Sequence, residues 1–222
     1  MYDIIPEAIL DRIGTAYERA IRRAQSRYRQ WQRDEDYASG AVGGTMEELV
    51  KGKAAANGST YQWNTTTWPV RGKGPHSPET EYGADAVIEI VLRDEFGETV
   101  ASKILPIQYK KEKIYSNRTL AKQADRLSKL PGGGLIVSFS ERGFTSCEAH
   151  VVAEAHGKWA AIPENLKPDF GHMLAEDFLP CKIGSRDLVY DARREVFHTI
   201  DGRDIRLSAR RRIRTLIKKT PR

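Results

Sequence analysis

The chain has 222 residues, of which 40% are hydrophobic and 9% aromatic, and its formal net charge is +6. This apolar content suffices for a packed core and argues against global disorder. No apolar run approaches the ~20 residues of a membrane-spanning helix, so no membrane partner is expected. Acidic residues among the first fourteen positions and a total of only two cysteines predict a cytoplasmic protein without a secretion signal.

The positive charge is concentrated in two segments. Residues 203–222 contain nine Lys or Arg and one Asp, whereas the other 202 residues together carry a net charge of −2. Residues 18–33 contain six Arg and one Glu. Basic runs beside aromatic residues suit phosphate backbones, although a solvated helix face and a disordered tail are the alternative. The predicted nucleic-acid contacts are Arg22, Arg23, Arg210, Arg211, Arg212, Arg214, Lys218 and Lys219.

In the first third of the chain, helical spacing of apolar residues predicts a helix over residues 6–33. The glycine-rich stretch that follows is expected to break it. Thr45 with Glu48 three residues later forms a capping-box pattern, which predicts a second helix that ends at Asn57-Gly58. Threonine and aromatic residues favour a strand over 59–70, and glycine and proline favour a loop over 71–83.

The middle of the chain predicts a β-hairpin with strands 84–92 and 99–111 around a turn at 93–98. A helix over 117–134 that stops at Pro-Gly-Gly-Gly and an apolar strand over 135–140 follow. Helices near 146–156 and 169–178 and a hairpin within 187–202 complete the expected elements. We therefore expect a single α/β domain over 1–222, with an N-terminal helix (1–34), a core (35–140), C-terminal helices and a hairpin (141–202) and a basic tail (203–222).

The predicted hairpin brings three polar residues together. Its turn is centred near Phe96 and Gly97, so paired residues have numbers that sum to about 193, and position 85 lies opposite position 108. Residues 108 and 110 share a face because side chains alternate along a strand. Directly opposed side chains lie ~5 Å apart. Asp85, Gln108 and Lys110 are therefore expected to converge at the open end of the hairpin.

These three residue types suit metal-assisted chemistry on a phosphate. A carboxylate and an amide oxygen are ligands that Mg²⁺ prefers. A lysine beside the metal can orient or deprotonate a water molecule and offset charge on the phosphate. One carboxylate binds Mg²⁺ weakly, so a second acid is expected. The candidates in the preceding segments are Glu79, Glu81, Glu35, Asp36, Glu47 and Glu48.

An acid before "GAD" (83–85), a hairpin that ends in Gln-x-Lys (108–110) and a following Gln-bearing helix resemble the PD-(D/E)xK nuclease superfamily. The pattern is most similar to the Mrr-like and related bacterial restriction or phage-defence branch, in which Gln replaces the usual second acid. The resemblance covers about residues 35–140. It implies a restriction-endonuclease-like core of order α-β-β-β-α-β, with a mixed central sheet flanked by helices.

The resemblance also implies a role for individual residues. Asp85 would bind Mg²⁺ or Mn²⁺, Gln108 would supply a metal-shell oxygen, and Lys110 would be the catalytic lysine. Glu79, six residues before Asp85, and Glu35 near the first core helix would be further metal ligands, and Gln123 would support the site. The implied function is a metal-dependent endonuclease that hydrolyses phosphodiester bonds of double-stranded DNA in restriction or phage defence, with a homodimer as the implied assembly.

Two other functions are compatible with the sequence. One is a non-catalytic nucleic-acid-binding module that keeps a nuclease-like fold and binds through the tail, independently of Asp85 and Lys110. Considered singly, Asp85 has the alternative interpretation of a turn residue, and Lys110 that of a solvated strand end. The other is an interaction protein whose tail binds an acidic partner. A zinc site made of Cys147, His150, His172 and Cys181 is disfavoured, because the spacing of His172 and Cys181 is poor for a half-site.

Overall fold

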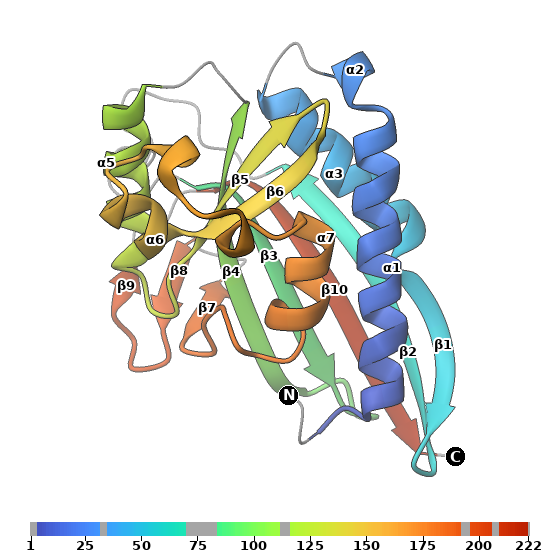
Figure 1. The fold of residues 1–222 in the computed structure, drawn as a ribbon. Helices are drawn as coiled ribbons and strands as arrows, with labels where there is room; N and C mark the ends of the chain where they lie inside the picture. The colour runs from blue at the N-terminus through green and yellow to red at the C-terminus, as the bar shows by residue number, and fades with distance from the viewer. Residues whose placement is uncertain are drawn as a thin grey trace.

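The computed structural model describes residues 4–31, 35–69, 84–111, 116–191, 196–205 and 209–221. These residues form a curled seven-stranded sheet in the order β1-β2-β10-β3-β4-β5-β6 and a separate three-stranded sheet in the order β7-β8-β9 (Figure 1). Strands β10 and β3, and strands β4 and β5, pair in parallel, and the other neighbours pair antiparallel. The prediction of an α/β fold with a mixed sheet is confirmed.

The strands of the large sheet are β1 (Lys51–Ala56), β2 (Ser59–Pro69), β3 (Ala84–Arg93), β4 (Thr99–Lys111), β5 (Leu135–Ser140), β6 (Gly143–Glu148) and β10 (Ala209–Pro221). Those of the small sheet are β7 (Leu188–Asp191), β8 (Val196–Thr199) and β9 (Asp204–Ile205). The helices are α1 (Glu7–Ser26), α2 (Tyr28–Trp31), α3 (Glu35–Leu49), α5 (Asn117–Ser128), α6 (Ala149–Glu154) and α7 (Phe170–Met173), with short η1 (Trp159–Ala161), η2 (Glu164–Leu166) and η3 (Leu174–Phe178). No helix in the described ranges is long and apolar enough to cross a membrane.

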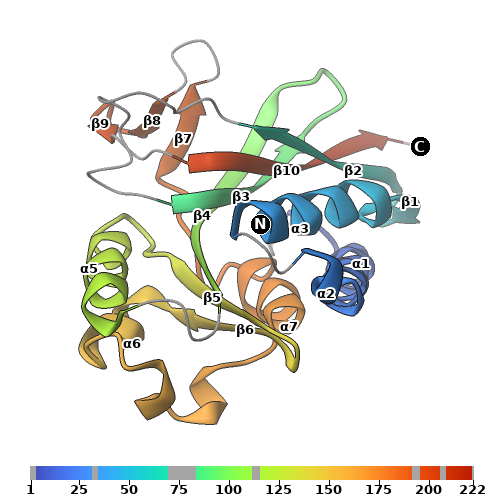
Figure 2. The same ribbon diagram turned by 90° about the horizontal axis from the view of Figure 1, so that it is seen from above.

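Each face of the large sheet has its own apolar cluster. Helices α1, α3 and α7 cover one face, which we call the α1 face, and pack on residues such as Ile88 and Ile107. The opposite face carries Asp85, Val87 and Glu89 and is called the Asp85 face. Helices α5 and α6 and the small sheet pack on it (Figure 2). The candidate catalytic residues therefore lie on the face opposite α1.

The turn at Asn57-Gly58 corrects the prediction of a helix over 45–56. Asn57 and Gly58 have φ of 49° and 71°, and Ala56 pairs with Ser59. Two consecutive residues with positive φ form the two-residue turn that matches the twist of a β-hairpin, and Asn-Gly is its preferred sequence. Residues 51–56 are therefore strand β1, and Asn57-Gly58 joins two strands instead of ending a helix.

The glycine-rich stretch lies within a helix, contrary to the prediction that it breaks one. Helix α3 passes close to β2 at Gly43. A Cβ atom there would lie 2.7 Å from the Cγ2 atom of Thr67, and the Thr67 hydroxyl donates a 2.9 Å hydrogen bond to the Gly43 carbonyl. Glycine lowers helix propensity, but here its missing side chain lets α3 pack directly on the sheet.

The basic C-terminal segment is a central strand, so the prediction of a basic tail over 203–222 is wrong. Strand β10 pairs with β2 on one side and β3 on the other. Ile213, Thr215 and Ile217 are fully buried on the α1 face. The Thr215 hydroxyl lies 2.8 Å from the Tyr17 hydroxyl of α1 and 2.7 Å from the Thr65 hydroxyl of β2. These buried hydrogen bonds tie β10 to two other elements of the core.

One arginine of β10 forms a buried ion pair with β3. Arg212 donates from Nε and Nη2 to the Glu89 Oε2 atom at 2.9 and 2.6 Å, and both side chains are about nine-tenths buried. The guanidinium lies 4.1 Å from the Tyr190 ring centroid and 5.7 Å from that of Trp68. Arg212 therefore joins the two sheets, and its charge is balanced inside the protein.

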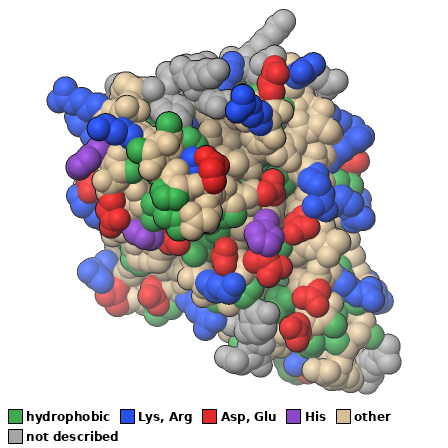
Figure 3. Space-filling model, viewed as in Figure 1, with side chains coloured by type: hydrophobic (Ala, Val, Ile, Leu, Met, Phe, Trp, Pro, Cys, Tyr) green, Lys and Arg blue, Asp and Glu red, His purple; other side chains and the backbone are tan. Residues whose placement is uncertain are grey.

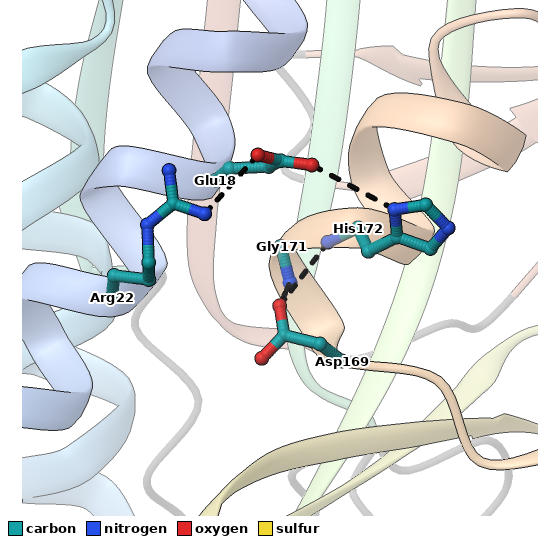
Figure 4. A network of polar contacts seen from close by, with 5 residues as sticks. All are labelled: Glu18, Arg22, Asp169, Gly171 and His172. Carbon is teal, nitrogen blue, oxygen red and sulfur yellow. Dashed lines mark hydrogen bonds and ion pairs between the residues drawn. The ribbon is translucent and has the colours of Figure 1, made fainter.

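Helix α1 contacts α7 through a small polar network. The Asp169 carboxylate accepts hydrogen bonds from the backbone N–H groups of Gly171 and His172 at 2.8 and 3.2 Å and so caps α7 (Figure 4). The Glu18 carboxylate of α1 lies 3.2 Å from the Arg22 guanidinium and 3.7 Å from the His172 ring. The predicted helix near 169–178 is confirmed as α7 followed by the π-helical η3.

The remaining predicted elements agree with the structure apart from their ends. Strand β5 and hairpin β3–β4 have the expected positions, and β7 and β8 form the hairpin expected within 187–202. The helix expected near 146–156 begins at Ala149, because residues 143–148 extend the sheet as β6. Helix α5 is capped by the Ser116 side chain, which accepts a hydrogen bond from the Thr119 backbone.

Candidate active site

The register of the β3–β4 hairpin is the one that the turn position predicts. Ala86 pairs with Ile107 and Ile88 with Leu105, so the residue numbers sum to 193 over most of the hairpin. The register shifts only next to the turn, between Leu92 and Arg93. Asp85 therefore lies opposite Gln108 at the open end, and both side chains are on the Asp85 face.

Hydrogen bonds fix the carboxylate of Asp85 against strand β4. Its Oδ2 atom accepts from the Gln108 side-chain Nε2 and, at 2.8 Å, from the Tyr109 backbone N–H. Its Oδ1 atom lies 3.9 Å from Nε of Arg210 on β10. Asp85 is 7% exposed and Gln108 3% exposed. Asp85 is therefore held by groups on both neighbouring strands, with its Oδ1 atom towards the more exposed Arg210 side chain.

Lys110 lies two residues beyond Gln108 on the same face of β4. It is 7% exposed and is in register with the buried Ser138 of the parallel strand β5. A lysine with so little exposed surface carries its charge in surroundings of low polarity, where it interacts more strongly with nearby charges than it would in water. Lys110 is thus a buried cation on the same face as a buried carboxylate.

The core on the α1 face stabilises this end of β4. The Tyr109 ring, fully buried on that face, stacks on Phe139 with a centroid distance of 4.9 Å. Burial and the nearby charge of Asp85 raise the pKa of Tyr109 well above its ordinary value. Packing of this ring fixes the position of the Tyr109 backbone N–H, which donates a hydrogen bond to the Asp85 carboxylate.

Helix α5 packs on the Asp85 face through Leu120, Ala124 and Leu127. The Oε1 atom of Gln123 is buried and accepts no hydrogen bond within the part of the chain that the structure describes. Gln123 belongs to the side of α5 that faces the protein, since it is separated from Leu120 and Leu127 by three and four residues. Its supporting role stays a prediction.

The other predicted acids are not joined to this cluster. Glu79 and Glu81 lie outside the described residues, and the side chains of Glu35 and Asp36 are likewise not described. Glu47 accepts a 3.3 Å hydrogen bond from the Thr67 backbone, and Glu48 is exposed. In the described ranges, no three His, Cys, Asp or Glu side chains are grouped to hold a metal ion. The described donor set is one carboxylate and one amide.

This donor set suits a hard divalent cation better than zinc. Mg²⁺ is often bound through one or two carboxylates and takes its remaining oxygen ligands from water and substrate phosphates. Cys147, proposed above as part of a less favoured zinc site, is fully buried, and burial raises the pKa of its thiol to about 12. His150 is exposed beside Glu148 at 3.6 Å. Of the ligands that the sequence suggested, Asp85 and Gln108 are therefore the described pair that a hydrogen bond joins.

A second buried lysine was not anticipated from the sequence. Lys103 is fully buried on the α1 face with Nζ 4.2 Å from the Phe178 ring centroid, and burial lowers its pKa to about 8. Burial raises the pKa of the neighbouring Cys181 thiol, but a hydrogen bond from Arg186 and the charge of Lys103 outweigh it, so that this pKa is below its ordinary value. Lys103 lies on the same face of β4 as the buried Leu105 and Ile107. This position in the strand alternation was the signal in the sequence that could have identified it as buried.

No protein-family model, curated protein or solved structure matches this chain.

Proposed function

We propose that the chain is a metal-dependent endonuclease that hydrolyses phosphodiester bonds, with a core of the restriction-endonuclease type. The observation that carries this proposal is the convergence of Asp85 and Gln108, joined by a hydrogen bond, with the buried Lys110 on the same face of β4. The PD-(D/E)xK pattern of the sequence supports it. DNA is the expected substrate, and the restriction or phage-defence role and the homodimer follow from the resemblance alone.

Asp85 and Gln108 would hold Mg²⁺ or Mn²⁺. The bound cation would lower the pKa of a water molecule and stabilise charge on a phosphoryl oxygen. Gln108 now donates its amide N–H to Asp85, and rotation of the amide by 180° would present its oxygen to the cation instead. Arg210, 3.9 Å from the carboxylate, would be released to contact a phosphate.

Lys110 would orient the attacking water and stabilise negative charge on the phosphate. Its ammonium carries donors but no acceptor, and its low exposure strengthens the electrostatic effect. Asp85, fixed by the Tyr109 backbone N–H, keeps its position without support from the substrate. Preorganised charges of this kind contribute to rate because they need not reorganise during the reaction.

We expect Asp85→Asn to lower metal-dependent plasmid nicking by about 10²–10³-fold, as removal of one electrostatic contact to a transition state does in other enzymes. The assay compares supercoiled plasmid with Mg²⁺, Mn²⁺ or EDTA. Asp125→Asn is the matched control, because Asp125 is exposed on α5 and paired with Lys129 at 2.6 Å. Wild-type cutting that persists in Asp85→Asn would contradict the site.

A non-catalytic nucleic-acid-binding module is the second candidate function. It is favoured by one observation: the described donors to a cation are limited to one carboxylate and one amide whose N–H faces that carboxylate. This candidate predicts binding of DNA that depends on salt but not on Asp85 or Lys110. Absence of wild-type nicking with every cation, together with intact binding, would favour it over the nuclease.

A further inference from the structure

Charge is distributed very unevenly over the three strands at one side of the large sheet. Strands β1, β2 and β10 contain no Asp or Glu, whereas β1 contains two lysines and β10 contains four arginines and two lysines. Helix α1 is different, because Glu7, Asp11 and Glu18 stand among its arginines. Cationic and acidic side chains are accordingly interspersed on the α1 side of the molecule (Figure 3).

The pairing registers show which of the cations share a face. Lys53 is paired with Gln62, which is paired with Lys218, so these three residues form one row across the sheet. The next row contains Lys51, Asn64 and Leu216. Alternation along β10 puts Arg210, Arg212, Arg214 and Lys218 on one side of the strand. Since Arg212 bonds to Glu89, these rows belong to the Asp85 face.

This part of the Asp85 face is open to solvent. Lys51, Lys53, Gln62, Asn64 and Lys218 are exposed, and Arg214 is half-buried. On the same strands, the side chains that face α1 are mostly buried, among them Tyr61, Trp63 and Ile217. The exposed half of the strands is therefore mainly polar and cationic, and its larger apolar side chains, Leu216 and Trp68, are half-buried.

Arg214 marks the edge of this surface. Its guanidinium lies 4.7 Å from the Trp68 ring centroid, and its Nε atom is buried without a hydrogen-bond partner in the described ranges. Burial lowers the pKa of Arg214, and the nearby Arg212 lowers it further, although Glu89 acts in the opposite direction. An anion on the surface would pair with the Arg214 guanidinium and accept a hydrogen bond from it.

We propose that Lys51, Lys53, Gln62, Asn64, Arg214 and Lys218 form a binding surface for the phosphate backbone of nucleic acid. We call it the β1–β2–β10 surface. The three strands carry positive charge and no acidic side chain of their own, and Glu89 of the neighbouring β3 is already paired with Arg212. Such a surface is the electrostatic complement of a polyphosphate. The amides of Gln62 and Asn64 add hydrogen-bond donors to phosphate oxygens. The surface differs from the segments that the sequence alone suggested, because it includes β1 and omits the ion-paired Arg212.

The surface and the candidate active site are on the same face of the sheet. Arg210 lies beside Asp85, and Lys218 is in register with Arg93 at the other end of β3. Eight residues of β10 separate the two positions, about 26 Å at ~3.3 Å per residue. That distance corresponds to about eight base pairs of duplex at ~3.4 Å each. The assignment deepens the proposed function, but binding at the surface does not require that the site cleaves.

Lysines on β1 have a second possible role, because β1 is an edge strand and lysine on such strands prevents edge-to-edge association. This role does not explain Lys218 and Arg214, which lie two strands from the edge. A charge-reversal experiment separates the two explanations, since edge protection predicts self-association without a change in nucleic-acid affinity.

The test is fluorescence anisotropy of a labelled 20-base-pair DNA duplex in EDTA, which measures binding without cleavage. We expect the double variant Lys53→Glu/Lys218→Glu to bind about tenfold or more weakly, and the slope of log affinity against log salt to fall by about two. The matched control is Lys122→Glu/Lys158→Glu, which changes net charge equally at two exposed positions outside the three strands. It should remain within about twofold of wild type.

Equal affinities of the two double variants would overturn the proposal, as would self-association of the sheet variant with unchanged affinity. Thermal melts of both variants establish that they are folded. The outcome is separable from that of the nicking assay. Loss of binding in the sheet variant, with a wild type that cuts no substrate, supports the surface and removes the nuclease. Nicking by the wild type, together with equal affinities of the two double variants, supports the nuclease and overturns the binding surface.

Discussion

Replacing Lys110 by Met is expected to lower metal-dependent cleavage by about 10²–10⁴-fold, the range for a side chain that positions or transfers a proton. Methionine keeps most of the length of the lysine stem, so the nearly buried position stays filled while the charge is removed. We expect little loss of thermal stability. The rate should be measured with enzyme in excess, so that weaker DNA binding does not lower it.

Lys111→Met is the matched control for this experiment. Lys111 is the next residue on β4 and is less buried, and its side chain points to the opposite face of the strand. It should leave the cleavage rate within a few-fold of wild type. Equal loss of activity in both variants would show that charge at this end of β4, rather than the Lys110 ammonium, is what matters.

Deletion of residues 209–222 is expected to abolish cooperative folding. Removing β10 leaves both β2 and β3 without a pairing partner on that side. It also deletes the buried Ile213 and Ile217. Loss of the two isoleucines alone costs about 3–6 kcal/mol. Glu89 would remain buried without Arg212, at a further cost of about 3–5 kcal/mol. Together these losses are comparable with the ~5–15 kcal/mol stability of a typical domain.

Circular dichroism and urea denaturation test this prediction. The control is deletion of residues 220–222, since Thr220 and Pro221 are exposed at the end of β10. That variant should unfold cooperatively, with a midpoint near that of wild type. A 209–222 deletion that folds as wild type and merely binds nucleic acid less tightly would restore the interpretation of this segment as a detachable basic tail.

The hairpin of the candidate site was predictable because its information is local. The turn around Phe96 and Gly97 fixes the register, and β3 and β4 follow directly on either side. Alternation then determines which side chains share a face. The convergence of Asp85 and Gln108 needed nothing from the rest of the chain, whereas the contact of Arg210 with Asp85 depends on a strand more than 100 residues away.

Strand β10 was missed for the opposite reason. Ile213, Thr215 and Ile217 alternate with Arg212, Arg214 and Leu216, which is a strand pattern, but nine cations in twenty residues dominated its interpretation. Its place between β2 and β3 comes from long-range pairing, which local periodicity does not contain. The ion pair of Glu89 and Arg212 is visible only in the structure, because no local sequence pattern relates two residues so far apart along the chain.

The errors around residues 35–58 have a different physical origin. Glycines lower helix propensity, and the Ala-rich residues 54–56 raise it, so local preference puts the helix in the wrong half of the segment. In the first half of the segment, packing of Gly43 against Thr67 stabilises helix α3. In the second half, the Asn57-Gly58 turn pairs residues 51–56 with β2 as a strand. Here tertiary packing and turn chemistry override propensity. The interpretation of residues 1–222 as one domain stays a prediction.

The most direct test of the central claim is to map where a divalent cation binds. Fe²⁺ is substituted for Mg²⁺ in the presence of a non-cleavable DNA duplex, and ascorbate with peroxide then generates hydroxyl radicals that cut the polypeptide next to the metal. We predict fragments that end near Asp85 and near Gln108 to Lys110, and their loss in Asp85→Asn. Absence of these cuts, or cuts that persist in Asp85→Asn, would contradict a metal site at the open end of the β3–β4 hairpin.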